Sequence, residues 1–299
     1  MPVAFSTCPL CEATCGLAIT VADGAVTSIR GDADDVLSHG FVCPKGASLT
    51  ELHDDPDRLR TPLIREPGGG FRAASWDEAI AEIDRRLPAI QAEHGGDAVA
   101  AYIGNPSAHN LSSLIYGRVL LKALRTRNLF SASTVDQYPK QMASALMFGS
   151  GATVAVPDVD RTDHLLILGA NPLASNGSLL TAPDMRGRLR AIRARGGKIV
   201  VIDPRRTPTA READEHHFIR PGTDALLLLA LTHALFDEEL VDPRALGPHL
   251  AGLDEVRALA GEISPEGVAA ACGIAAPQIR RMARELAAAP SAAVYGRIG

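Results

Sequence analysis

Four of the five cysteines in this chain lie within its first 43 residues. They are Cys8, Cys11, Cys15 and Cys43, in the spacing C-x2-C-x3-C-x27-C. Three closely spaced thiolates on one loop can wrap one face of an iron–sulfur cluster, and a fourth thiolate from a distant turn can close the site. Structural zinc more often uses two paired knuckles, and the second knuckle is absent here. The spacing therefore favours a [4Fe-4S] cluster, with zinc as the alternative.

The composition gives no indication of a nucleic-acid or membrane partner. The net charge is -5 and only 4% of the residues are aromatic, which disfavours both a basic patch and a base-stacking platform. The longest apolar run, residues 225–236, is too short for a membrane span. Because no basic and apolar leader precedes the cysteines, we expect a cytoplasmic protein. In that reducing compartment clustered cysteines are more typical of metal ligands than of disulfides.

The hydrophobic pattern predicts two small domains in the first half of the chain. Residues 1–62 are expected to form a cysteine-bearing domain with short strands, including a hairpin that turns at Asp23-Gly24. Residues 63–150 are expected to form an incomplete α/β domain, in which Ser75 and Glu78 make a capping box at the start of a helix. Two further elements of that domain are a buried strand and an amphipathic helix, at 97–105 and 111–126.

Residues 151–299 predict a third domain, in which strands alternate with helices. Strand, helix and strand in succession imply a right-handed βαβ unit in a parallel sheet. The expected strands are 164–169, 198–203 and 216–219, and the expected helices include 184–196 and 223–240. The arginines of the 184–196 helix are expected to form a solvent-exposed face. The predicted fold class is thus α/β, with a small N-terminal iron–sulfur domain followed by parallel-sheet, dinucleotide-binding-like domains.

Polar residues follow two successive strands of this predicted sheet. The segments "GANPLAS" and "DPRRTPT" would leave the carboxyl edge of a parallel sheet, where nucleotides bind in open α/β folds. Asp203 could accept hydrogen bonds from a guanine or ribose, and Asn171 and Ser175 could donate to phosphate or sugar oxygens. Gly222 would admit a close ligand, and Asp224 would either cap the following helix or bind guanine. From the residues alone, Asn171-Pro172 could form only a turn and Asp224 only a helix N-cap.

Five segments together resemble one enzyme family. In chain order they are "CPLCEATC…CPKG", "PLIRE…FRAASWDEAI", "LGANPLAS", "VIDPRRTPTA" and "IRPGTDALLLLAL". This set is similar to the bis-molybdopterin guanine dinucleotide oxidoreductases, which include formate dehydrogenases and nitrate reductases. The similarity runs from Cys8 to about Leu231 and weakens beyond it.

The resemblance implies cofactors and residue roles. The four cysteines would hold one [4Fe-4S] cluster, and Lys45 would relay electrons between that cluster and a molybdenum or tungsten bis-molybdopterin guanine dinucleotide. The substrate would be a small molecule, with formate and nitrate as candidates. The implied cofactor-binding residues are Lys45, Asn171, Pro172, Ser175, Asp203, Arg205, Thr207, Gly222 and Asp224.

One segment departs from the family pattern. Formate dehydrogenases ligate the metal through a cysteine or selenocysteine in V-D-x-x-x-R-x-C, where this chain has Lys140 and Met142 in place of the arginine and the cysteine. A thioether is a weak, neutral donor. The metal would then bind without a protein ligand, or through Asp136 or Ser144 in a rearranged loop. This departure keeps open an alternative, an iron–sulfur electron-transfer subunit without molybdenum, like the large iron–sulfur subunit of respiratory complex I.

Length is the second departure, because catalytic subunits of the family are much longer. We expect the N-terminal part of a longer or split enzyme, which needs a redox partner protein or a missing C-terminal region and does not turn over alone. The third hypothesis is a binding domain that is held together by zinc and fused to a nucleotide-binding fold.

Overall fold

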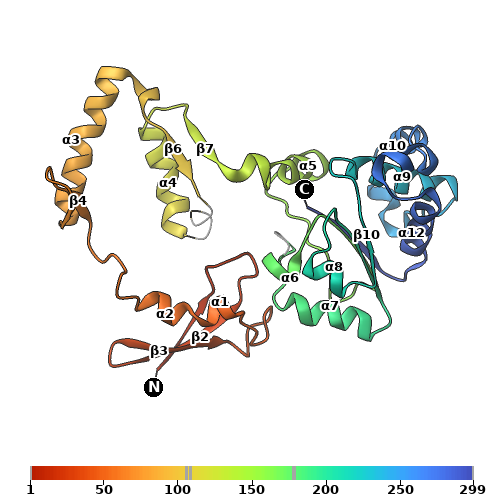
Figure 1. Ribbon diagram of the computed structural model, residues 1–299, viewed down its shortest axis with the longest axis horizontal. Helices are drawn as coiled ribbons and strands as arrows, with labels where there is room; N and C mark the ends of the chain where they lie inside the picture. The colour runs from red at the N-terminus through yellow and green to blue at the C-terminus, as the bar shows by residue number, and fades with distance from the viewer. Residues whose placement is uncertain (1, 105–106, 108–109, 177–179, 298–299) are drawn as a thin grey trace. The chain divides into compact units, whose positions relative to one another are not determined.

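The computed structural model describes residues 2–104, 107, 110–176 and 180–297 (Figure 1). The chain divides into two compact units, Met1–Pro139 and Lys140–Gly299. The predicted three-domain division, with boundaries after residues 62 and 150, stays a prediction. Across the described ranges, every helix is too short or too polar to cross a membrane.

Unit 1 begins with a small antiparallel sheet. Its strands, in spatial order, are β1 (Val3–Thr7), β2 (Gly16–Ala22) and β3 (Ala25–Gly31). Asp23 and Gly24 join β2 to β3 with φ angles of 53° and 78°, so the predicted hairpin is confirmed. Two short helices, α1 (Pro44–Ala47) and α2 (Leu49–His53), contact β3.

The rest of unit 1 is a set of helices and short strands. Its elements are β4 (Leu63–Arg65), β5 (Phe71–Ala73), α3 (Trp76–His94), η1 (Gly96–Ala98), β6 (Ala101–Ile103), α4 (Leu111–Ala123), β7 (Leu129–Ser131) and η3 (Ala132–Val135). Ser75 and Glu78 form the predicted capping box, with bonds of 3.1 and 2.8 Å. The strand predicted within 97–105 forms as β6, but Tyr102 is 72% exposed. The predicted burial is wrong because β6 pairs only with β7, in a two-stranded sheet.

Unit 2 contains the predicted parallel sheet. Its strands lie in the order β10 (Glu215–His217), β9 (Lys198–Ile202), β8 (His164–Leu168) and β11 (Ala292–Gly296), all parallel. From β8 the chain moves outward to β9 and β10, and β11 then returns to the other side of β8. The strand order therefore reverses between β8 and β11, and open α/β sheets bind ligands outside the carboxyl ends of the strands at such a point.

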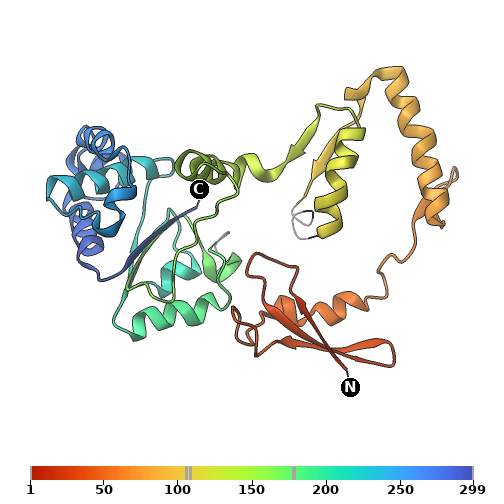
Figure 2. The same cartoon turned by 180° about the vertical axis from the view of Figure 1, so that it is seen from behind.

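Helices cover both faces of this sheet (Figures 1 and 2). The elements outside the sheet are α5 (Tyr138–Phe148), which begins at the unit junction, α6 (Pro172–Ser175), α7 (Met185–Ala194), α8 (Pro208–Glu212), α9 (Asp224–Asp237), η4 (Arg244–His249), α10 (Leu253–Gly261), α11 (Pro265–Cys272) and α12 (Ala276–Ala288). Leu166 and Leu168 of β8 pack with α9, α11 and α12, whereas Leu165 and Ile167 pack with α7 and α8. Burial of both faces explains the continuous apolar runs of these strands.

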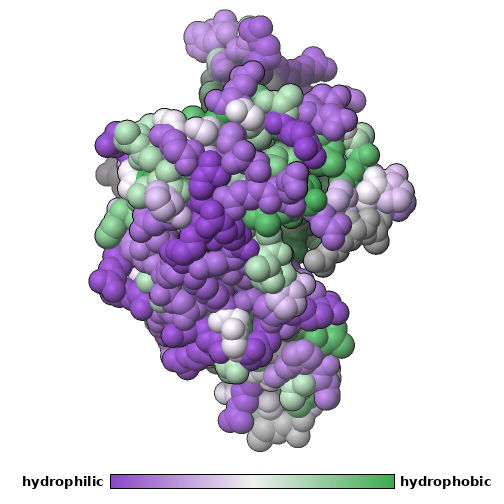
Figure 3. Space-filling view, turned by 90° about the vertical axis from the view of Figure 1, so that its right-hand side faces the viewer, coloured by the Kyte–Doolittle hydropathy of each residue, from purple (hydrophilic) through white to green (hydrophobic). Residues whose placement is uncertain are grey.

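The arginine-rich helix α7 is more tightly anchored than its sequence suggested. Arg195 donates to the carbonyl of Val159 at 3.1 Å, and Arg193 pairs with Asp214 at 2.9 Å. Arg188 pairs with Asp160 and is only 15% exposed. The prediction of a solvated face is therefore wrong for Arg188, because a neighbouring loop supplies its carboxylate partner, whereas Arg193 and Arg195 are exposed as predicted. Hydrophilic side chains do dominate the face in Figure 3, on the side where α9, α10 and α12 lie.

Candidate cofactor sites

The first three cysteines lie on the connection between β1 and β2. Cys8 follows the last residue of β1 and Cys15 precedes the first residue of β2. The amide of Cys8 donates to the carbonyl of Cys15 at 2.9 Å, which closes the loop. Within it, the amide of Thr14 donates to the carbonyl of Cys11 at 3.3 Å, and Thr14 has a positive φ of 48°. The antiparallel pairing of β1 with β2 thus brings three thiols together.

Cys43 approaches from the short helix α1, for which it is the N-cap residue. Pro44 occupies the first turn, where a missing N–H costs nothing. A Cβ on Gly46 would lie 2.6 Å from Cγ2 of Val42 and 3.6 Å from Sγ of Cys8. Because only a residue without a side chain fits there, α1 can lie against the Cys8 thiol.

A polar brace holds the segment before Cys43 against the cysteine loop. The hydroxyl and amide of Ser38 donate to Asp35 at 2.6 and 2.7 Å, and the Ser38 oxygen accepts from the amide of Gly16 at 3.0 Å. The Ser38 hydrogen bonds hold the pKa of Asp35 below its ordinary value. Gly16 directly follows Cys15, so this brace fixes one end of the loop.

The four thiols share one partly shielded region. Cys8 and Cys15 are each only 6% exposed, and Cys11 and Cys43 are half-buried. Burial, followed by the neighbouring thiols of Cys8, Cys11 and Cys43, raises the pKa of Cys15 to about 11. Burial also raises the pKa of Cys11, with smaller contributions from Cys8 and Cys43. Thiols that repel one another as thiolates are stabilised by bound cationic iron, so this donor set fits an iron–sulfur cluster.

A single metal ion and a four-iron cluster require different spacings between the thiolate sulfurs. In the part of the chain that the structure describes, no group of three or more His, Cys, Asp or Glu is arranged to hold one metal ion. Thiolates around one zinc, at about 2.3 Å, would stand about 4 Å apart. In a four-iron cluster each thiolate binds its own iron, so the sulfurs are more widely spaced. Cys272 is fully buried in α11, in the apolar core of unit 2.

Lys45 is the second residue of α1, two positions after Cys43. Its side chain is exposed. No carboxylate pairs with it among the described residues. Lys45 follows Cys43 by two positions in the sequence, and its predicted role as an electron relay stays a prediction.

In unit 2, Asn171 and Thr209 join the two loops that the sequence assigned to a dinucleotide. The Thr209 hydroxyl donates to Oδ1 of Asn171 at 2.7 Å and accepts from the amide of Leu173 at 3.2 Å. The amide of Thr209 also donates to Oδ1 of Asn171, at 3.3 Å. Pro172, the first residue of α6, is buried between them. The Asn171 carbonyl is therefore engaged within the protein, which leaves its NH₂ group as the donor for a ligand.

Asp203 directly follows β9 at the same edge of the sheet and is only 7% exposed. Its Oδ1 accepts from the amide of Arg205 at 2.7 Å, and its backbone carbonyl bonds with Nε2 of His216 at 3.0 Å. Thr207 is 3% exposed and caps α8, because its hydroxyl accepts from the amide of Ala210 at 3.1 Å. Thr207 thus shapes the loop, whereas the exposed Arg205 side chain can reach a ligand.

Asn176 is a residue that the sequence reasoning missed. It ends α6 in a left-handed conformation, with φ of 53°. Its Nδ2 is buried and has no hydrogen-bond partner in the described ranges. A buried amide without a partner costs about 1–3 kcal/mol, so a bound acceptor would stabilise it. This orphaned donor and the exposed Ser175 one residue before it fit the phosphate or sugar oxygens of a dinucleotide.

Gly222 and Asp224 precede α9. Gly222 has a φ of 81°, which favours glycine, and a Cβ there would meet no heavy atom within 4 Å. The N-cap residue of α9 is Thr223, so the reading of Asp224 as that cap is wrong. The Asp224 carboxylate accepts no hydrogen bond from any described residue, which leaves both oxygens for a ligand.

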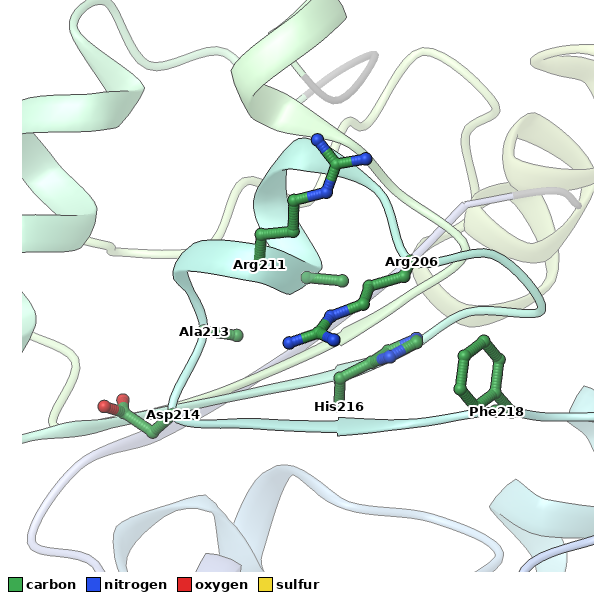
Figure 4. A pocket seen from close by; sticks show the side chains of 7 residues that line it. Arg206, Arg211, Ala213, Asp214, His216 and Phe218 are labelled. Atoms are coloured by element: carbon green, nitrogen blue, oxygen red, sulfur yellow. The ribbon is translucent and has the colours of Figure 1, made fainter.

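A separate pocket of about 350 Å³ lies between α8 and the edge strand β10 (Figure 4). In Figure 4 the Arg206 side chain extends toward His216, whereas Arg211 and Asp214 point away from it. The His216 and Phe218 rings meet edge to face, with centroids 4.5 Å apart. None of the predicted cofactor-binding residues lines this pocket.

The segment that departs from the family pattern forms the start of α5. Met142 is 45% exposed and Ser144 is buried. The Lys140 ammonium lies 4.1 Å from the centroid of the Tyr295 ring.

Comparison with known proteins decides the family. The family model described as "Molybdopterin oxidoreductase Fe4S4 domain" matches residues 1–55. The family model described as "Molybdopterin oxidoreductase" matches residues 58–262, which is more than half of the chain. The chain belongs to the molybdopterin oxidoreductase family. The family implies a [4Fe-4S] cluster and a molybdopterin cofactor, as the resemblance predicted.

The relatives of this chain are named for different reactions. Formate dehydrogenase H of Escherichia coli is 29% identical over 100% of this chain and 42% of its own length. The molybdopterin-containing subunit of thiosulfate reductase of Salmonella typhimurium is 30% identical over 97% and 37%. The periplasmic nitrate reductase of Desulfovibrio desulfuricans is 30% identical over 94% and 38%. The chain thus spans about two fifths of the length of these relatives.

The fold is similar to that of a solved family structure. Acetylene hydratase from Pelobacter acetylenicus superposes with a TM-score of 0.76 at 23% identity, over 97% of this chain and 40% of that one. This likeness confirms the predicted fold class. The roles of individual cofactor-binding residues in this chain stay predictions.

Proposed function

We propose that this chain is the cluster-bearing and dinucleotide-binding part of a molybdenum or tungsten oxidoreductase that acts on a small molecule, with formate and nitrate as the first candidates. The observation that carries the proposal is the convergence of four thiols in a chain of this family. When bound, the metal–pterin centre would supply the exchange of electrons with substrate, and the cluster would pass them on singly. The substrates named for the relatives span several reactions, so the family alone does not determine the substrate.

The residues of the chain divide the work between the two cofactors. Cys8, Cys11, Cys15 and Cys43 would hold the cluster. The NH₂ groups of Asn171 and Asn176 would donate to phosphate or sugar oxygens, and Asp203 and Asp224 would accept from guanine or ribose. Arg205 would pair with a phosphate, where its planar donors suit the oxygens. Gly222 would let the backbone approach the ligand.

Anaerobic reconstitution followed by electron paramagnetic resonance tests the cluster. The wild-type chain should take up about four irons and give the spectrum of a reduced cubane. Cys8→Ser and Cys43→Ser should lose that spectrum, whereas Cys272→Ala should keep it. The proposal fails if the two serine variants reconstitute as well as Cys272→Ala, or if the metal taken up is one zinc.

Lys45→Gln tests the electron relay, with Lys122→Gln on α4 as the matched control. Both variants should keep their full iron content, because neither side chain is a ligand. The Lys45 variant should shift the reduction potential of the cluster, since a nearby positive charge stabilises the reduced, more negative cluster. Equal potentials in the two variants would remove Lys45 from this role.

A second candidate function is electron transfer without molybdenum. Met142 favours it, because a thioether stands where the formate dehydrogenases carry a metal-ligating thiolate or selenolate. Molybdenum and tungsten analysis of the purified protein, together with the partner or region that completes it, separates the two candidates. Stoichiometric molybdenum or tungsten excludes this second function, and its persistent absence beside an intact cluster supports it.

We also propose a cytoplasmic location, because clustered thiols of raised pKa need a reducing compartment to stay unpaired. Fractionation of the native host tests this directly, and recovery of the protein outside the cytoplasm would contradict it.

A further inference from the structure

The pocket between α8 and the edge strand β10 combines an aromatic wall with two cations. Figure 4 shows the Arg206 side chain extending toward the His216 ring. Arg211 also lines the pocket, and no residue that the structure describes pairs with the guanidinium of Arg206 or Arg211. Phe218 is 60% exposed, so its ring offers an apolar wall that a ligand can cover.

The acidic residues that follow Arg211 in the sequence are already paired with helix α7. Glu212 pairs with Arg186, and Asp214, which also lines the pocket, pairs with Arg193 at 2.9 Å. These carboxylates therefore do not neutralise the two arginines of the pocket. A carboxylate that entered from outside would gain charge-assisted hydrogen bonds, since its two oxygens match the planar donors of a guanidinium.

β10 leaves one edge of the unit 2 sheet open. It lies first in the strand order and pairs with β9, and among the strands of the described residues none lies beyond it. On the α12 face, Glu215 of β10 is held by Lys198 and Arg281, at 2.5 and 2.6 Å. On the α8 face, the bond with the Asp203 carbonyl fixes the His216 ring at the border of the pocket.

An open strand edge and a pocket beside it suit an extended peptide. The edge presents backbone donors and acceptors that can pair with a further strand. Because side chains alternate along a strand, every second side chain of such a peptide would lie on the α8 face, where the pocket is.

We propose that the edge formed by β10 and α8 is a docking site for an acidic, extended segment of a partner protein. The segment adds a strand beside β10 and places a carboxylate in the pocket, where Arg206 and Arg211 bind it. An apolar side chain two positions along the segment lies on the same face and covers the Phe218 ring. None of the predicted cofactor-binding residues lines this pocket, so the site goes beyond the proposed function and requires neither cofactor.

Fluorescence anisotropy of the full chain with labelled peptides tests the site. The probe is fluorescein-labelled Thr-Glu-Thr-Val-Thr-Glu, and the comparison peptide has lysine in place of both glutamates. The wild type should bind the glutamate probe at least tenfold more tightly than the lysine peptide. Arg206→Gln should weaken binding of the glutamate probe about tenfold, Arg206→Lys should keep part of it, and Phe218→Ser should weaken it several-fold.

Arg190→Gln is the matched control. Arg190 is an exposed arginine on the neighbouring helix α7 and has no partner among the described residues, so its loss should leave the affinity unchanged. Equal affinities of the wild type and Arg206→Gln would overturn the proposal, as would a wild type that does not bind the glutamate probe. Displacement of the probe by GDP would also overturn it, because the pocket would then belong to the nucleotide.

Hydrogen exchange of the wild-type chain covers the case in which a variant does not fold. Saturating glutamate probe should slow exchange several-fold in residues 214–218, because a new strand pairs with the open edge, and should leave the amides of α3 unchanged. Unchanged exchange in β10 would refute strand addition. Cluster assembly is scored separately by iron content, so a negative result here leaves the proposed function standing.

Discussion

Replacement of Thr209 by valine should loosen the two loops that carry the predicted dinucleotide site. Thr209 is 1% exposed, and its hydroxyl makes two hydrogen bonds, to Oδ1 of Asn171 at 2.7 Å and from the amide of Leu173 at 3.2 Å. Valine has nearly the same shape but neither bond. Each lost bond costs about 1 kcal/mol, and the partly buried Leu173 amide is left without an acceptor. The extra buried methyl returns about 0.8 kcal/mol.

We therefore expect Thr209→Val to lower the free energy of unfolding by about 1–2 kcal/mol. Urea unfolding followed by far-ultraviolet circular dichroism measures this, and hydrogen exchange of the Leu173 amide measures the local loosening. Thr232→Val is the control, because its hydroxyl bonds to the Leu228 carbonyl in an exposed setting, and it should change stability by less than about 0.5 kcal/mol. If the two variants unfold alike and Leu173 exchanges as in the wild type, the loops are not joined in this way.

Two further substitutions test the two units separately. Gly31→Ala would place a Cβ 2.0 Å from the carbonyl oxygen of Gly40 and should lower the free energy of unfolding of unit 1 by about 1–3 kcal/mol. Gly117→Ala in α4, where the new Cβ meets open space, should raise that free energy by up to about 1 kcal/mol. Equal melting temperatures of the two variants would contradict this packing. In unit 2, hydrogen bonds from Arg280 lower the pKa of Glu266 from 4.5 to about 2. A carboxyl group whose pKa is lowered stabilises the fold above pH 4.5, and this contribution is lost as the pH falls toward 2. Glu266→Gln should therefore make the free energy of unfolding vary less with pH in that window. An unchanged pH dependence would show that the ion pair contributes nothing.

Features that depend on neighbouring residues were predictable from the sequence. The capping box at Ser75 needs only Glu78 three positions later, and the hairpin needs only Asp23-Gly24 between alternating strands. The parallel sheet followed from the alternation of apolar strands with helices, because a sheet buried on both faces carries continuous apolar runs. The expectation of a [4Fe-4S] cluster likewise followed from the cysteine spacing, and the match to the Fe4S4 domain bears it out.

Features that depend on distant partners were not predictable in the same way. The bond between Asn171 and Thr209 joins residues 38 positions apart, and nothing near either residue indicates it. Arg188 was predicted to be solvated because the carboxylate that pairs with it belongs to Asp160, 28 positions earlier. The unpartnered amide of Asn176 is a property of burial, which a left-handed asparagine in a turn does not reveal by itself.

The two predicted cofactor sites also differ in the sequence separation of the contacts that form them. The cysteine ligands, the Ser38 brace and the α1 N-cap all lie between Cys8 and Ala47, so the cluster site needs only short loop closures. The edge that is predicted to bind the dinucleotide instead needs β8 and β11 to pair across more than 120 residues before Lys140 can contact Tyr295 of β11. Contacts of long sequence separation form late in folding. The predicted cluster segment can therefore form early, while the edge that is predicted to bind the dinucleotide still awaits the last strand of the sheet.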